Sequence, residues 1–213
     1  MILAINTATH THELALVDDG KILLEKSWQD SKDDVEKLTP TLAGMLSEIG
    51  INKSEIDSIL VVSGPGSFTS LRTGVAFANA LASALSSKLY AIDTFELLSR
   101  KAAIKPLLVI LNAGGLDVAL HHDETHIGHL ADVVRNFPHE KFSVVSECTE
   151  TQEDELHGIC LEKKWKQIQG HELQTLGETI LTFDFHGLQP VKVVEPVYMK
   201  GPIITKSTNK WKQ

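Results

Sequence analysis

Residues 61–76 read VVSGPGSFTSLRTGVA and carry the strongest structural signal in the chain. The apolar run up to Ser63 predicts a buried strand, Gly64-Pro65-Gly66 predicts a tight turn, and Ser67 or Thr69 would open a helix. Glycine lets the backbone take positive φ and approach another chain or an anion closely, and free amides at a helix start can bind an anion. A plain turn between a strand and a helix, with a capping hydroxyl, explains the pattern equally well.

The helix predicted after this turn, from about residue 70 to residue 86, has little side-chain bulk. Leucine and valine supply one apolar face, at Leu71, Val75, Leu81 and Leu85. Small residues occupy several other positions: Gly74, Ala76, Ala78, Ala80, Ala82 and Ala84. The core of this chain could cover one helix face of small side chains. Because small side chains occupy a second face as well, we expect a second helix, from a partner, to pack against this one.

Upstream of this segment the sequence predicts a strand–turn–strand unit and a helix. Residues 2–5, 13–17 and 21–28 are expected to form strands, with hairpin-turn chemistry at Asp18-Asp19-Gly20. From residue 33 to residue 49 apolar residues recur at the three- and four-residue spacings of a helix. They form one stripe, which contains Val35, Leu38, Leu42, Met45, Leu46 and Ile49. Pro40 predicts a bend in this helix or a later start.

Downstream, strands and helices continue to alternate, which indicates the α/β class. Strands are predicted at 58–63, 88–92 and 107–111, and Asp93-Thr94 can cap a helix that continues through Arg100. Further strands are expected at 116–121, 142–145 and 157–161, with a helix near 172–181. Lys105-Pro106 marks the expected boundary between a first subdomain, residues 1–104, and a second subdomain, residues 105–200, which a polar tail, residues 201–213, follows.

Composition excludes several classes of protein. The chain has 213 residues and a formal net charge of −8, whereas a protein that holds nucleic acid by itself is usually basic. No apolar run approaches the roughly 18 residues of a membrane span, and no basic region precedes the apolar start, so neither a membrane protein nor a secretory signal is expected. Cys148 and Cys160 predict two reduced thiols in a cytoplasmic protein, with a disulfide or a metal role as the alternative.

Candidate catalytic and metal-binding residues are few. His121, His122, His126 and His129 lie close to Asp123 and Glu124, and such residues can bind zinc or iron. Their spacing matches no established motif, and a solvated polar loop is the prediction. The sequence contains no P-loop, dinucleotide fingerprint or nucleophile elbow. We therefore expect no catalytic residue and no metal site.

Residues 61–76 closely resemble the GPGSFTGLR-x-G signature of the TsaB (YeaZ) family. Other stretches agree in order: ILAINTAT at 2–9, EKLTP at 36–40, LLVILNA at 107–113 and EPVYM at 195–199 resemble the family's strand, helix and closing segments. The resemblance is dense over residues 1–112 and thin from there to about 190. It implies an actin-like ATPase, RNase H-like fold with two subdomains, of which the second is smaller and diverged and the first binds a partner.

Departures from the family's pattern bear on activity. Catalytic members of this fold carry an Asp at the end of the first strand, where this chain has Asn6, and Asn112 replaces a second Asp. A usual Arg is missing from Ala113-Gly114-Gly115, and Val35 stands where a His is common. Because magnesium prefers carboxylate oxygens, an ATPase site in this chain alone is not expected. The alternative, a nucleotide-binding ATPase or kinase of the actin/Hsp70-like superfamily, remains open.

The resemblance implies a non-catalytic scaffold or activator subunit of the tRNA threonylcarbamoyladenosine-37 modification complex. It would dimerise with a TsaD-like subunit through a helical bundle, recruit a TsaE-like ATPase and contact tRNA only through the complex, although the tail lysines could form a patch that faces tRNA. A homodimer through the same surface is possible. ATP and metal would belong to the partner subunits, and this chain would hold no cofactor itself.

Two groups of residues follow from this reading. The expected interface comprises apolar positions of the two helices: Leu38, Leu42, Met45, Leu71, Val75, Ala78 and Ala82. The turn that would fix the second helix comprises Gly64, Pro65, Gly66, Ser67 and Thr69.

Overall fold

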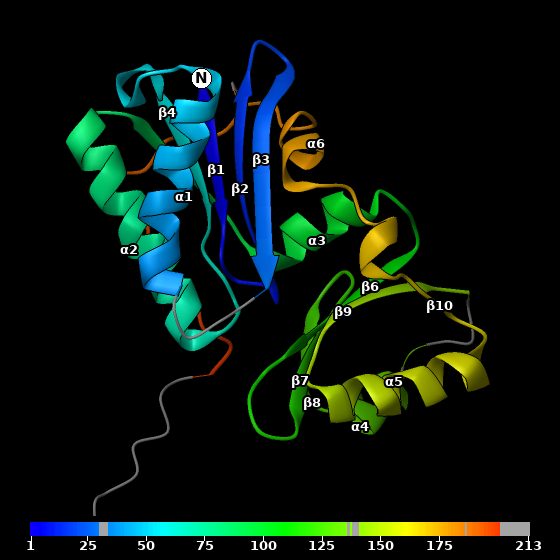
Figure 1. Cartoon of the computed structure of the whole chain (residues 1–213). Coiled ribbons are helices and arrows are strands. Elements are labelled where there is room, and N and C mark those ends of the chain that lie inside the picture. The colour runs from blue at the N-terminus through cyan, green and yellow to red at the C-terminus, as the bar shows by residue number, and fades with distance from the viewer. Residues whose placement is uncertain (30–33, 136, 138–140, 186, 201–213) are drawn as a thin grey trace, which may run out of the picture.

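A computed structural model of the chain describes residues 1–213 apart from 30–33, 136, 138–140, 186 and 201–213. The polar tail predicted at 201–213 therefore lies outside the described residues. The chain forms two five-stranded sheets, one in each subdomain, with helices packed against them (Figure 1). The predicted α/β class is confirmed.

The first sheet has the order β3-β2-β1-β4-β5. Strands β1 (Ile2–Asn6), β2 (Thr11–Asp18) and β3 (Lys21–Gln29) form an antiparallel meander, as the strand–turn–strand pattern predicts. Strands β4 (Ser58–Val62) and β5 (Lys88–Ile92) continue the sheet in parallel with β1. Residues of β1 and β4 are almost completely buried because helices cover both faces of the sheet.

Figure 1 shows helices α1 (Asp34–Ile49) and α2 (Phe68–Leu85) on one side of this sheet and α3 (Thr94–Ala102) and α6 (Leu176–Ile180) on the other. Both predicted long helices are confirmed. Helix α1 includes Pro40 in its interior and begins before it, so the proline does not mark a later start. A short 3₁₀ helix, Lys53–Glu55, precedes β4.

The second sheet has the order β10-β9-β6-β7-β8 and repeats the topology of the first. Strands β6 (Leu107–Asn112), β7 (Asp117–His121) and β8 (Thr125–His129) form an antiparallel meander, while β9 (Ser143–Glu147) and β10 (Lys166–Gln167) extend it in parallel. One face packs against α4 (Leu130–Arg135) and α5 (Glu150–Lys163). The other face packs against α3 of the first subdomain.

The alternation of side chains along β6 explains this double covering. Leu108 and Ile110 belong to the apolar cluster with α4 and α5, whereas Leu107, Val109 and Leu111 belong to the cluster with Phe95 and Leu98 of α3. Successive residues of a strand point to opposite faces, so β6 joins both clusters. The two subdomains thus share one apolar contact around α3.

Three predictions for the second subdomain require correction. The strand predicted at 157–161 lies inside α5, and the polar loop predicted around the histidines is the β7–β8 hairpin. The helix predicted at 172–181 is a 3₁₀ turn, Gly170–Glu172, followed by the short helix α6.

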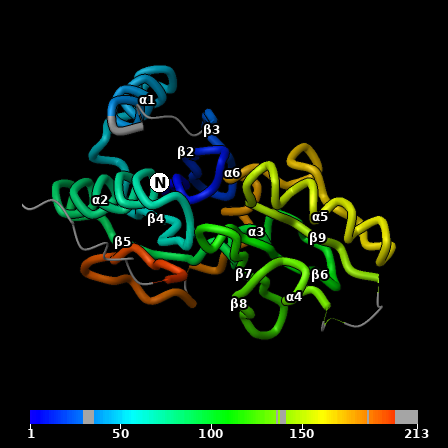
Figure 2. The backbone as a smooth tube through the Cα atoms, turned by 90° about the horizontal axis from the view of Figure 1, so that it is seen from below, coloured from blue at the N-terminus to red at the C-terminus, as the bar shows by residue number. Residues whose placement is uncertain are grey.

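The end of the described chain also departs from the boundaries expected at 105–200. Helix α6 packs against the first sheet, and Leu176 and Ile180 belong to the core of the first subdomain. Residues 189–198 then form an extended segment, here called the strap, which Figure 2 shows beside β5 and α2. The first subdomain is therefore built from both ends of the described chain.

Candidate functional site

The turn between β4 and α2 is held by two hydrogen bonds from Thr94, the first residue of α3. The backbone oxygen of Gly64 accepts a hydrogen bond from the amide of Thr94 (2.8 Å), and the Thr94 hydroxyl donates to the oxygen of Pro65 (2.6 Å). Gly64 has a φ of +108°, a conformation that L side chains rarely adopt. Ser67 is the N-cap residue of α2, and its backbone oxygen accepts from the amide of Leu71 (2.9 Å).

Two glycines bring α2 close to the loop that follows β1. A Cβ on Gly66 would lie 2.1 Å from the backbone oxygen of Ala8, and one on Gly74 would lie 2.1 Å from Oγ1 of Thr7. Thr7 is fully buried, and its hydroxyl donates to the oxygen of Ser70 (2.8 Å). The signature residues therefore hold the start of α2 close to the β1–β2 loop.

A cleft of about 460 Å³ lies between the two subdomains. The β1–β2 loop, the start of α2 and the β6–β7 loop line it, together with Glu147 of β9, Tyr198 at the end of the strap and the two residues that follow it. At its edge the exposed rings of Phe68 and Tyr198 lie 5.1 Å apart, with the guanidinium of Arg72 5.1 Å from the Phe68 ring. Its position, near the ends of central strands in both sheets, is where α/β proteins commonly bind ligands.

Asn6, the last residue of β1, belongs to a buried hydrogen-bond network with the β1–β2 loop, β2 and α3. Nδ2 of Asn6 donates to Oε2 of Glu13 (2.9 Å) and to Oγ1 of Thr9 (2.7 Å), and Oδ1 accepts from the amide of Ala8 (3.1 Å). Nζ of Lys101 on α3 lies 2.6 Å from both carboxylate oxygens of Glu13. All four side chains that make these contacts, those of Asn6, Thr9, Glu13 and Lys101, are buried.

A magnesium–nucleotide complex, which the fold class implies, does not match this donor set. Asn6 and Asn112 are neutral, and Oδ1 of Asn112 accepts from the amide of Gly114 (2.8 Å). The buried carboxylate of Glu13 is already paired with the ammonium of Lys101. Hard cations prefer carboxylate oxygens that are free to coordinate, so the residues at the two strand ends do not fit the metal.

The four histidines near the β7–β8 hairpin make separate contacts. Nδ1 of His121 lies 2.9 Å from the Thr125 hydroxyl, Nδ1 of His122 lies 2.9 Å from the oxygen of Leu107, and the His126 ring packs edge-on against Phe137. Nε2 of His129 lies 3.9 Å from Asp117. Within the described residues, no group of three or more His, Cys, Asp or Glu side chains is arranged to hold a metal ion.

All seven residues expected at the partner interface lie in the core of this chain. Leu38, Leu42 and Met45 of α1 are at most 5% exposed, as are Leu71, Val75 and Ala78 of α2, and Ala82 is 7% exposed. These side chains pack between the helices and the first sheet. In this structure they are therefore not exposed for contact with a partner.

The outer face of α2 is a line of small side chains. Thr69, Thr73, Ala76, Ala80 and Ser83 follow one another at alternating spacings of four and three residues. Four of them are exposed and Thr73 is half-buried. We call these five residues the α2 seam. The abundance of alanine was visible in the sequence, but the sequence alone did not tell which small residues face outward.

Outer positions on α1 repeat this spacing. Glu36, Pro40, Ala43 and Ser47 are all exposed.

None of the helices in the described part of the chain combines the length and the apolar character that a membrane crossing requires.

Comparisons with known proteins agree with this architecture. The family model described as TsaD, tRNA N6-adenosine threonylcarbamoyltransferase, matches residues 29–189. An uncharacterized protein of Mycobacterium tuberculosis is 32% identical over 114 residues, which is 53% of this chain and 54% of that protein. The tRNA threonylcarbamoyladenosine biosynthesis protein TsaB of Bacillus subtilis is 30% identical over 98 residues, 46% of this chain and 43% of TsaB. The chain thus spans about half the length of the curated relatives it matches.

Among solved structures, YeaZ from Pseudomonas aeruginosa superimposes with a TM-score of 0.69 at 18% identity, covering 93% of this chain and 99% of YeaZ. A Bacteroides thetaiotaomicron protein with an actin-like ATPase fold has a TM-score of 0.51 at 10% identity, covering 86% of this chain and 96% of that one. The expected actin-like ATPase fold is confirmed.

Proposed function

Because this chain belongs to the family described as TsaD, tRNA N6-adenosine threonylcarbamoyltransferase, we propose that it is a TsaB-like subunit that takes part in forming threonylcarbamoyladenosine in tRNA. In this role it is a non-catalytic scaffold or activator. A TsaD-like subunit docks on it through a helical bundle and carries out the transfer.

The α2 seam is the observation that carries this proposal. Small side chains at alternating spacings of four and three residues allow another helix to pack closely along α2, and such spacing is typical of helices that pack side by side. The seam alanines do not belong to this chain's core, since Leu71, Val75 and Ala78 already fill the inner face. The outer positions of α1 extend the same surface, and a homodimer could use it when the TsaD-like partner is absent.

The residues of the cleft support a non-catalytic role. Family members that hold a metal–nucleotide complex need acidic groups where this chain has Asn6 and Asn112. Glu13, the buried carboxylate beside Asn6, is neutralised by Lys101. ATP and metal therefore belong to the TsaD-like partner and to a TsaE-like ATPase that joins the complex.

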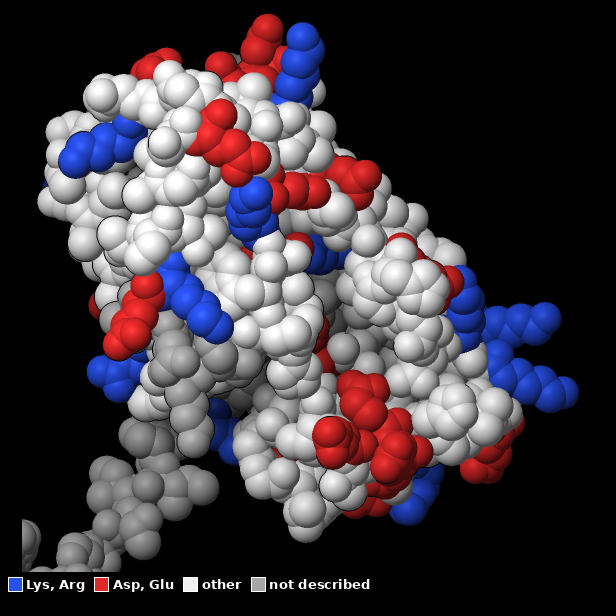
Figure 3. Space-filling model, viewed as in Figure 1, with Lys and Arg blue, Asp and Glu red and all other residues white. Residues whose placement is uncertain are grey.

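Charge supports contact with tRNA through the other subunits. The formal net charge is −8, and acidic residues gather at the beginning of α5 at Glu150, Glu153, Asp154 and Glu155. Figure 3 shows a group of acidic side chains on the second subdomain in this view. Such a surface repels phosphate.

Copurification with the TsaD-like protein of the same organism tests the proposal. Ala76→Glu and Ala80→Glu place a charge on the seam, where a docked helix would bury it without a counter-ion, and each is expected to abolish a complex that the wild type forms. Ala131→Glu, at an exposed position on α4, is the matched control and should leave the complex intact. The seam variants should keep the circular dichroism spectrum of the wild type because both positions are exposed.

Two results would contradict this proposal. The first is normal binding of the TsaD-like subunit by both seam variants. The second is tight binding of ATP with magnesium by the isolated chain in a calorimetric titration, lost when Asn6 is changed, which would favour the nucleotide-binding alternative.

A further inference from the structure

The first subdomain contacts the second through a polar bridge at the cleft. His10 lies in the β1–β2 loop, and Glu147 is the last residue of β9. The amide of His10 donates to Oε2 of Glu147 (2.8 Å), and Nδ1 of the same residue lies 3.0 Å from that oxygen. One carboxylate of the second subdomain thus holds both the backbone and the side chain of one residue of the first.

Glu147 lies in a mostly buried site at this bridge. Its side chain is only 20% exposed, and burial raises the pKa of the carboxyl group above its ordinary value. The groups that oppose this rise are the amide and ring of His10 and, more weakly, the ammonium of Lys101, whereas Glu153 adds to it. As long as the cleft has this width, an ionised Glu147 depends chiefly on His10 for the contacts that compensate its burial.

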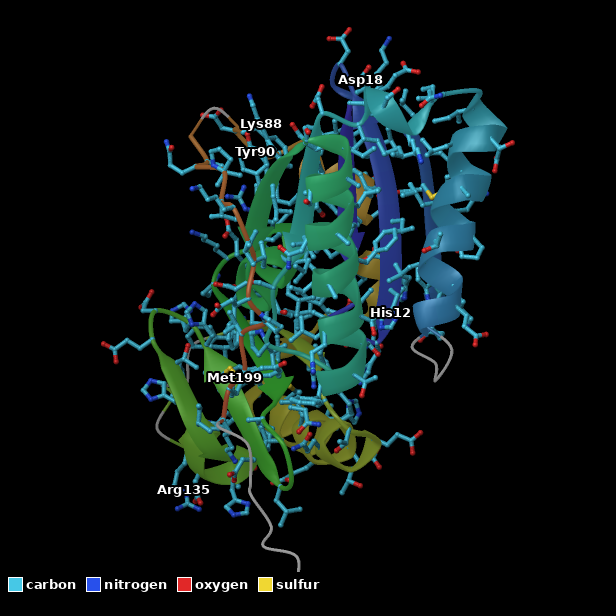
Figure 4. All side chains as sticks on the ribbon, turned by 90° about the vertical axis from the view of Figure 1, so that its left-hand side faces the viewer. His12, Asp18, Lys88, Tyr90, Arg135 and Met199 are labelled. Atoms are coloured by element: carbon cyan, nitrogen blue, oxygen red, sulfur yellow. The ribbon has the colours of Figure 1, made fainter. Side chains whose placement is uncertain are left out.

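A second bridge is made after the strap. The strap is fixed to the first subdomain at three points: the amide of Val191 donates to Leu89 (2.8 Å), Val194 exchanges two hydrogen bonds with the side chain of Asn79 (2.9 Å each), and the amide of Val197 donates to Ser63 (2.7 Å). Figure 4 labels Met199 where this segment reaches the second subdomain.

Beyond these three points the chain contacts the second subdomain directly. Met199 packs against the apolar cluster shared with α3, and the ammonium of Lys200 donates to the carboxylate of Asp117 on β7. This contact lowers the pKa of Asp117. A segment that is anchored to one subdomain therefore ends in an ion pair with the other.

We propose that these two bridges, His10 with Glu147 and Lys200 with Asp117, form an interdomain latch that sets the width of the cleft. The apolar contact around α3 joins the subdomains, and the hydrophobic effect that drives it is non-directional. Hydrogen bonds and ion pairs with defined geometry select a single arrangement from those that the apolar contact allows. The chain's own residues thus hold the two halves of the cleft together, in the way a bound ligand closes a two-lobed protein.

Distances between spin labels on the two subdomains test this latch in the isolated full-length chain. Labels are attached to Lys53→Cys in the first subdomain and Glu155→Cys on α5 in the second, both at exposed positions. The native thiols interfere little at neutral pH, because both are buried and burial raises the pKa of Cys148 to about 12 and that of Cys160 to about 11.

The wild type is expected to give one narrow distance distribution. Glu147→Ala and Lys200→Met should each broaden it, and the double variant should shift the mean to a longer distance. Glu162→Ala, which removes an exposed carboxylate from α5, is the control and should give the wild-type distribution.

A second double variant distinguishes loss of the bridges from loss of folding. His10→Ala with Lys200→Met changes two side chains that are 59% and 37% exposed, and it is expected to broaden the distribution while the circular dichroism spectrum stays unchanged. His10→Ala leaves the backbone amide of residue 10 bonded to Glu147, so the decisive case is the double variant Glu147→Ala with Lys200→Met: a wild-type distance distribution in that variant, with an unchanged circular dichroism spectrum, would overturn the latch. Since no partner subunit takes part, that result would leave the proposed scaffold role standing.

Discussion

Nζ of Lys101 on α3 lies 2.6 Å from both carboxylate oxygens of Glu13 on β2, and each side chain is only 9% exposed. This pair joins the helix between the two sheets to a strand of the first sheet. It also places an ammonium group next to the Asn6 network, because Nδ2 of Asn6 donates to the same carboxylate. The buried pair therefore links α3, which packs against the second sheet, to the core of the first subdomain.

We predict that Lys101→Met destabilises the protein strongly. Removing one partner leaves the other charge buried without compensation, which costs about 3–5 kcal/mol in comparable pairs. The double variant Glu13→Gln with Lys101→Met removes both charges and should recover a large part of that loss. Urea unfolding measures the free energies, and Lys53→Met at an exposed position is the control. A Lys101→Met protein as stable as the wild type would show that the pair contributes nothing to folding.

Local sequence patterns predicted the first subdomain well because its elements have clear periods. The meander of β1, β2 and β3 has apolar strands and a turn at Asp18-Asp19-Gly20, and α1 and α2 have stripes of helical spacing. Such signals depend only on neighbouring residues. In contrast, the return of α6 and the strap to the first sheet depends on contacts such as that of Val191 with Leu89, which no local pattern contains.

Helix α5 shows why the second subdomain was harder to predict. Its apolar residues do not form one stripe, since Leu156 and Cys160 are buried while Leu161 is 68% exposed. The short apolar run at 157–161 therefore favoured a strand. A better signal was present at the start of the helix, where Thr149 and Gln152 form a capping box.

The candidate site was predicted in part. The turn at Gly64–Thr69 was identified because glycine, proline and capping residues have local meaning. Leu42 and Ala78 were expected at the interface, yet they are buried, because a helical stripe indicates which residues share a face but not what covers that face. Glu13 and Lys101, which are 88 residues apart, gave no sequence signal of their pairing.

Introducing an acidic group at the end of β1 is predicted to destabilise the protein. Nδ2 of Asn6 donates to Glu13 and Thr9, so Asn6→Asp replaces a donor with a carboxylate oxygen close to the Glu13 carboxylate. The lost hydrogen bonds and the like charge at a fully buried position should cost about 3 kcal/mol at neutral pH. Asn112→Asp at the exposed end of β6 is the matched control and should cost less than about 0.5 kcal/mol.

The pH dependence of this variant distinguishes repulsion from a packing defect. Burial beside Glu13 should raise the pKa of the new carboxyl group in the folded state above its value of about 3.9 in the unfolded chain. The penalty is then present at neutral pH and diminishes as pH falls toward the unfolded value, because the folded state binds the proton more readily. Thermal unfolding of both proteins from pH 7 to pH 4 would show this convergence, and a constant difference would contradict it.

Gly66→Ala is predicted to destabilise the contact between the start of α2 and the β1–β2 loop. The added Cβ would lie 2.1 Å from the backbone oxygen of Ala8, and because backbone cannot rotate away like a side chain, the loop or the helix has to move. Overpacking of this kind costs about 1–3 kcal/mol. Gly158→Ala inside α5 is the matched control: apart from its chain neighbours and the backbone of the helix itself, no described atom lies within 4 Å of the added Cβ, so better helix propensity should stabilise the protein by about 0.5–1 kcal/mol. Urea unfolding of both variants measures these opposite signs. Equal stabilisation by the two substitutions would mean that α2 and the β1–β2 loop do not approach as closely as Gly66 allows.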